Sequence, residues 1–128
     1  MKITTTKETH MKTCTLTRAE TSKLKNILDS HNQWLTTGKK KGERANLSWA
    51  YLKGVNLEWA NLEGANLEGV NLEGANLEGA NLREANLREA NLEGAELKGA
   101  DLKGANLEGA YLEGAYLRRA DLKEKDPL

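Results

Sequence analysis

A five-residue unit runs without interruption from residue 45 to residue 124, sixteen times in succession. Each unit begins with Ala, replaced by Val at Val55 and Val70, and carries Leu two places later. In an α-helix a five-residue step rotates Leu by about 140°, so the leucines would spiral around every face. In a flat strand they would alternate between faces. The chain must therefore turn once per unit, which predicts a solenoid with Ala and Leu in its interior.

The turns are visible in the segment Leu-x-Gly-Ala, where Gly is the third of four residues. A type II turn requires a positive φ at that place, which Gly adopts at no steric cost. Gly occupies it in ten of the sixteen units. We expect a different turn geometry in the other six units, because a bulky residue at positive φ is disfavoured. Those units carry Trp49, Trp59, Glu84, Glu89, Arg119 and Glu124.

The run A-N-L-E-G-A-N-L-E-G resembles the pentapeptide repeat family, and the resemblance covers residues 45–124. It implies an all-β solenoid, a right-handed quadrilateral β-helix with four pentapeptides per coil and central Leu and preceding Ala inside. Sixteen units then form about four coils. Residues twenty apart stack above one another, so Asn columns are expected to hydrogen-bond along the stack or to the backbone.

An α-helix is expected over residues 18–36, before the repeats. Thr17 and Glu20 form a capping box, and Gly38 follows the last helical residue. Apolar spacing predicts one buried stripe, which comprises Leu24, Ile27, Leu28, His31 and Leu35. Residues 17–44 are therefore interpreted as a helix and linker that cap the solenoid, with Trp34, Trp49 and Trp59 at the junction. A partner-binding helix is the alternative, and residues 1–16 are expected to be a flexible tail.

The chain offers little for catalysis. His10 and Cys14 are too few ligands for a zinc site, and no pocket or orienting group for a Cys–His nucleophile is visible. We expect no enzyme, no metal and no cofactor. The single cysteine fits a reducing compartment, and no signal peptide or membrane-spanning run is visible, so a cytoplasmic protein is predicted.

Charge divides the chain into two halves. Residues 1–44 hold 10 basic and 4 acidic residues, a net of +6, and residues 45–124 hold 8 basic and 14 acidic residues, a net of −6. The basic arm is either solvated or steers association with an acidic partner. Glu73, Glu93 and Glu113 form a column that is a candidate acidic partner-binding face. Direct nucleic-acid binding is not expected, because the solenoid is acidic.

At the C-terminal end we expect no capping helix, since residues 125–128 make only a short tail. Tyr111 and Tyr116 replace Asn near this end, and amphipathic aromatic residues favour interfaces. We therefore expect a homodimer in which a second copy covers the last coil, with Tyr111, Tyr116, Leu117 and Leu122 as the candidate interface. Fraying of a monomer is the alternative.

These observations favour a non-catalytic, protein-binding scaffold whose partner is unknown. The resemblance implies an alternative, because some pentapeptide repeat proteins mimic DNA, bind DNA gyrase and give quinolone protection. In that case Glu73, Glu93 and Glu113 would imitate phosphates. A third hypothesis, chemistry in the N-terminal segment, predicts loss of an activity when His31 or Cys14 is changed.

Overall fold

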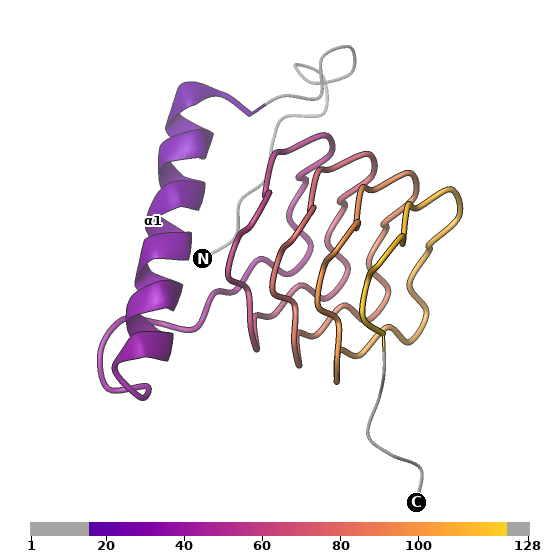
Figure 1. Cartoon of the computed structure of the whole chain (residues 1–128). Helices are drawn as coiled ribbons and strands as arrows, with labels where there is room; N and C mark the ends of the chain where they lie inside the picture. The colour runs from indigo at the N-terminus through magenta and orange to yellow at the C-terminus, as the bar shows by residue number, and fades with distance from the viewer. Residues whose placement is uncertain (1–15, 123–128) are drawn as a thin grey trace, which may run out of the picture.

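The computed structural model describes residues 16–122, and its single helix is α1 (Arg18–Thr36). This helix agrees with the predicted range. It lies across one end of a stack of coils, and the last coil, drawn in yellow, lies at the opposite end (Figure 1). Among residues 16–122 no helix has the length and apolar character needed to cross a membrane. The predicted tails over 1–16 and 125–128 lie outside the described residues, except for Leu16.

The repeats form coils of twenty residues. Isolated parallel β-bridges join residues twenty apart, from Asn46 with Asn66 to Asp101 with Asp121. We call residues 45–64, 65–84, 85–104 and 105–122 the first, second, third and fourth coil. Four pentapeptides per coil are thus confirmed, but within residues 16–122 the sides contain single bridges rather than strands, because each side is interrupted by a turn after a few residues. The right-handed sense of winding stays a prediction.

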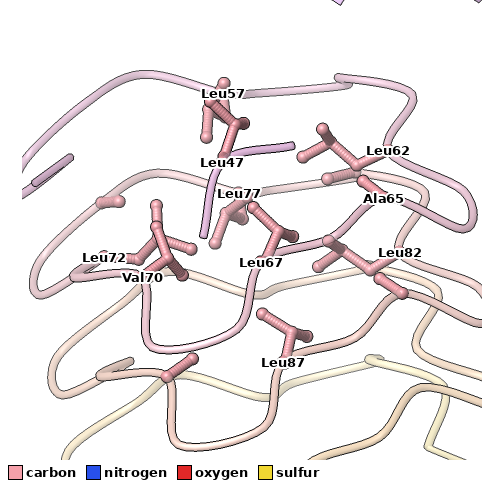
Figure 2. Close-up of a cluster of buried hydrophobic side chains, with 14 of the residues drawn as sticks. Leu47, Leu57, Leu62, Ala65, Leu67, Val70, Leu72, Leu77, Leu82 and Leu87 are labelled. Carbon is pink, nitrogen blue, oxygen red and sulfur yellow. The ribbon is translucent and has the colours of Figure 1, made fainter. Parts of the chain in front are cut away.

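Leucine fills the interior of the solenoid. Leu47, Leu67 and Leu87 lie one above another and point inward (Figure 2). Each of these side chains is 0% exposed. Burial of one such side chain contributes roughly 1.5–3 kcal/mol, so a column of leucines is a main source of stability.

The turns share one conformation, and the prediction that bulky residues change it is wrong. The Ala N–H that closes each turn donates to the Leu carbonyl three residues earlier, as from Ala50 to Leu47 at 3.1 Å. Positive φ at the third residue is adopted by Trp49 (63°) and Glu84 (57°) as well as by Gly74 (65°). Trp59, Glu89 and Arg119 behave in the same way, whereas Glu124 lies outside the described residues.

Stacking explains why the bulky turn residues keep this conformation. The N–H of the third turn residue donates to a carbonyl of the next coil, from Glu84 to Lys103 at 2.9 Å just as from Gly74 to Glu93 at 2.8 Å. A different turn would break this bond and the neighbouring ones. The cost of a left-handed non-glycine residue, about 1–2 kcal/mol, is smaller than that loss.

We call the third turn residue the corner residue. Bulky corner residues lie over glycines of the next coil: a Cβ on Gly69 would collide with the Trp49 indole, and one on Gly79 with the Trp59 indole. Trp49 and Trp59 are 52% and 70% exposed. Their side chains therefore pack against the second coil, and the prediction that they lie at the junction with α1 is wrong.

The asparagine columns bond mainly to their own backbone. Each side-chain carbonyl accepts a hydrogen bond from the N–H two residues later, as Asn76 does from Glu78 at 3.0 Å. One contact runs along a column, from Asn86 to Asn66 at 3.5 Å. Asp101 makes the same local bond with the Lys103 N–H at 3.1 Å. The repeat thus favours a short side chain with an oxygen acceptor at this place, which forms an Asx turn. Residues without such a side chain also occupy this place, namely Tyr51, Glu96, Tyr111 and Tyr116.

Candidate interaction surfaces

Helix α1 closes the N-terminal end of the solenoid. The predicted capping box is present, since Glu20 N–H donates to Thr17 Oγ1 at 3.1 Å and Thr17 N–H donates to Glu20 Oε1 at 2.9 Å. Leu24 is buried, and Ile27 and Leu28 pack against the same core. Leu16, which was predicted to belong to the flexible tail, is also partly buried there.

His31 attaches α1 to the first coil through both ring nitrogens. Nδ1 accepts a hydrogen bond from Ala45 N–H at 2.9 Å. Nε2 lies 2.8 Å from the Glu63 carbonyl oxygen and therefore donates to it. The ring is 0% exposed and stacks on Trp34, with 5.5 Å between centroids. These bonds require the neutral imidazole with its proton on Nε2.

Burial lowers the pKa of His31, and the Arg44 charge lowers it further. The hydrogen bond to the Glu63 carbonyl and the Glu63 charge act in the opposite direction. Protonation would also place a second N–H at Nδ1, facing the N–H of Ala45. The docked helix therefore favours neutral His31 on both electrostatic and geometric grounds.

The leucines at the two ends of the solenoid differ in their exposure to solvent. In the first coil the leucines are 0–3% exposed. In the fourth coil Leu107, Leu112 and Leu117 are only partly buried, and Leu122 is 42% exposed. A hollow of about 370 Å³ opens at this end, lined in part by Leu107, Leu112 and Leu122.

The residues predicted at a dimer interface lie at this open end. Tyr111 and Tyr116 occupy neighbouring sides of the fourth coil, and each is 62% exposed. Leu122 is exposed beside the hollow, whereas Leu117 is partly buried. The four residues thus share one coil, and their role as an interface stays a prediction.

The predicted acidic face carries a counter-charge at one end. Lys53 Nζ lies 2.8 Å from Glu73 Oε1. Below this pair, Glu93 is half-buried and Glu113 is exposed. The negative charge of this column therefore concentrates at Glu93 and Glu113, nearer the C-terminal end.

A charge ladder that was not predicted from the sequence lies on another side of the solenoid. Arg88 bonds to Glu108 Oε1 at 3.0 Å and to Glu68 Oε2 at 3.1 Å, which joins three coils. The Glu108 carboxylate, followed by Glu68, raises the pKa of Arg88. The twenty-residue spacing of Glu68, Arg88 and Glu108 was the signal that could have revealed it.

Other candidate chemistry is sparse in the described part of the chain. No group of three or more His, Cys, Asp or Glu side chains within residues 16–122 could hold a metal ion. His10 and Cys14 lie outside these residues. A groove of about 760 Å³ separates α1 from the start of the first coil, and its lining includes Ile27, Ser30 and Arg44.

The fold and its surfaces define a short-repeat solenoid with one helix at its N-terminal end. Residues 43–79, 65–104 and 95–124 match the family described as pentapeptide repeats. The chain belongs to the pentapeptide repeat family. No curated protein matches it in sequence.

One solved structure gives the same assignment, and two others are similar to the chain. A pentapeptide repeat protein from the thylakoid lumen of Arabidopsis thaliana is 32% identical, with a TM-score of 0.55 over 57% of this chain and 52% of that one. This chain thus spans about half of that protein. A pentapeptide repeat protein from Nostoc PCC 7120 is 32% identical over 77% of this chain and 85% of its own, with a TM-score of 0.38. QnrB1, a plasmid-mediated fluoroquinolone resistance protein, is 23% identical over 64% of this chain and 41% of its own, with a TM-score of 0.38.

Proposed function

We propose that the protein is a non-catalytic scaffold that binds a protein partner through one of its flat sides, in a reducing compartment such as the cytoplasm. The observation that carries this proposal is the ordered display of charge on stacked coils. Inter-coil hydrogen bonds of 2.7–3.0 Å hold the backbone under each side. A side chain on such a surface loses little backbone freedom on binding, which favours recognition by preorganised contacts.

Charge reversal on separate sides tests this proposal. Glu93→Lys with Glu113→Lys changes the acidic column, and Lys98→Glu with Arg118→Glu changes an equal number of charges on a neighbouring side. We expect proximity labelling in cells to detect one specific partner with the wild-type protein and with one of the two double variants. The same partner should be missing from the proteins labelled by the other double variant. An unchanged set of labelled proteins in both double variants would contradict binding through a charged side. Circular dichroism controls for folding.

A homodimer is a further part of this proposal. The open fourth coil exposes Tyr111, Tyr116 and Leu122, and a two-fold contact would cover the same patch on both copies. Sedimentation should detect a species of twice the 14.1 kDa chain mass at high concentration. A single 14 kDa species at every concentration would contradict the dimer.

The alternative function is gyrase binding by DNA mimicry, favoured by the stacked carboxylates of Glu93 and Glu113. The pairing of Glu73 with Lys53 at 2.8 Å weakens this mimicry at one end of the column. A supercoiling assay with DNA gyrase and a quinolone, across a salt series, distinguishes the two functions. Mimicry predicts salt-sensitive inhibition or drug protection that decreases when Glu73, Glu93 and Glu113 become Gln. A scaffold with another partner leaves gyrase unaffected.

A further inference from the structure

We propose that the fourth coil of one copy stacks on the first coil of a second copy, in the register that relates successive coils within the chain, when α1 is displaced. This head-to-tail contact is separate from the partner-binding function, and it competes with the two-fold dimer above because both cover the open end of the fourth coil. It uses two different surfaces, one at each end of the solenoid. A contact of this kind does not close on itself, so it generates open chains of copies.

Backbone groups at the two ends are complementary. Between the third and fourth coils, Leu87 N–H donates to the Asn106 carbonyl at 2.8 Å, and Asn106 N–H donates to the Ala85 carbonyl at 2.9 Å. The next step of the same register places Leu107 N–H against the Asn46 carbonyl of a second copy. Within residues 16–122, neither group takes part in a backbone hydrogen bond. The two ends thus carry the donors and acceptors that already pair inside the solenoid.

Charge in the column of Lys53, Glu73, Glu93 and Glu113 supports this junction. Inside the chain the column stacks Glu93 over Glu113, two like charges on adjacent coils. At the junction Glu113 would meet Lys53 of the second copy. Lys53 would then lie between two carboxylates, as Arg88 already does between Glu68 and Glu108.

The column of Glu58, Glu78, Lys98 and Arg118 shows the same relationship. Inside the chain it stacks Glu58 on Glu78 and Lys98 on Arg118, again with like charges on adjacent coils. At the junction Arg118 would meet Glu58 of the second copy. Both columns therefore end with the charge opposite to the one with which they begin, and opposite charges on adjacent strands attract.

Tyrosine placement agrees with the charges. The chain has three tyrosines, and they occur only in the first and fourth coils, as Tyr51, Tyr111 and Tyr116. The junction would stack Tyr111 on Tyr51, whereas within the chain Tyr111 bridges to Asn91. Aromatic pairs at directly opposed positions stabilise adjacent strands by roughly 0.2–1 kcal/mol.

Two features oppose this assembly in the capped protein. Helix α1 lies across the first coil and bonds to it through His31 (Figure 1). One corner is also mismatched: the described bulky corner residues of the first three coils lie over glycine, but Arg119 would lie over Trp59 of the second copy. Displacement of α1 is therefore required, and Arg119→Gly should strengthen the contact.

Sedimentation velocity of the full chain tests the proposal. His31→Ala removes both helix–coil bonds, and Leu24→Asp displaces α1 independently through its apolar side. In either variant, species of more than two copies should form as the protein concentration rises. In the Leu24→Asp protein, which keeps His31, detachment of α1, shown by increased amide exchange at Ala45, without such growth would overturn the proposal.

Charge reversals in the His31→Ala and Leu24→Asp proteins identify which residues make the contact. Arg118→Glu should weaken association about tenfold, the effect of ~1.4 kcal/mol, and Glu58→Arg in the same chain should restore it. Glu78→Arg is the matched control, since it lies in the same column away from the junction, and it should leave association unchanged. If association stops at two copies and is not changed by Glu58→Arg, the contact is two-fold, which would overturn the head-to-tail proposal.

Discussion

The imidazole of His31 bridges Ala45 and Glu63, accepting from the Ala45 N–H and donating to the Glu63 carbonyl. Elsewhere in the solenoid, backbone groups have these two roles. Within each turn a Leu carbonyl accepts from the Ala N–H, and between coils a corner N–H donates to a carbonyl of the next coil. His31 thus replaces the turn of a coil that would precede the first one, which explains how a helix can be joined to a β-solenoid without a change of register.

Docking of α1 should depend on pH through His31. Because the pKa of docked His31 is lowered, the undocked helix, with a pKa near 6.5, binds a proton first as the pH falls. Docking should be constant above about pH 6.5 and weaken below it, by at most ~1.4 kcal/mol per pH unit until the docked pKa is reached. Amide exchange at Ala45 across a pH series, corrected for intrinsic exchange, measures this change.

His31→Gln provides the control for this titration, because a Gln amide can accept and donate but does not titrate in this range. Its docking should be nearly independent of pH between 5 and 7. His10→Gln should keep the wild-type pH dependence. Equal pH dependence in the His31→Gln protein would show that His31 does not control the pH dependence of docking.

Corner glycines should differ in their tolerance of alanine. Gly69 and Gly74 share a φ of 65°, but only Gly69 lies under an indole, that of Trp49. Gly74→Ala should cost about 1 kcal/mol in the free energy of unfolding, and Gly69→Ala clearly more. Urea denaturation measures both changes.

The difference between these two glycines should disappear in a Trp49→Ala background. This double-mutant comparison isolates the contact between coils from the backbone strain that both positions share. If Gly69→Ala stayed the more costly change without the indole, the cause would lie in the turn itself.

Core truncation should depend on position along the solenoid. Leu77 is 0% exposed in the second coil, whereas Leu117 in the fourth coil is only partly buried. Leu77→Ala should lower the free energy of unfolding by about 2–5 kcal/mol, and Leu117→Ala by less. Equal losses in urea denaturation of the monomer would show that the fourth coil is covered.

The Arg88 ladder should contribute little to stability in spite of its short distances. The Arg88 side chain is 45% exposed, and solvent and salt screen such pairs. Arg88→Met should leave the free energy of unfolding almost unchanged, even at low salt. A large loss of stability that persists in 1 M salt would contradict this expectation.

Much of the architecture follows from local sequence. Leu every five residues requires one turn per unit, Thr17 and Glu20 define the start of α1, and Asn with its neighbouring backbone forms an Asx turn. Each of these effects acts within a few residues. The positions of Tyr111 and of the Glu93–Glu113 column also follow from the twenty-residue register.

The corner conformations and the attachment of α1 were decided by the tertiary structure, because both depend on contacts between segments that are distant in sequence. Trp49 and Glu84 adopt positive φ against their own preference, because each corner N–H bonds to the coil below it. His31 has the spacing of an apolar residue in α1, and only the docking of the helix reveals its two polar partners. The repeat by itself determines how the chain winds, since turning is local. The conformation of each corner and the attachment of the helix depend on stacked neighbours, because their hydrogen bonds join residues that are distant in sequence.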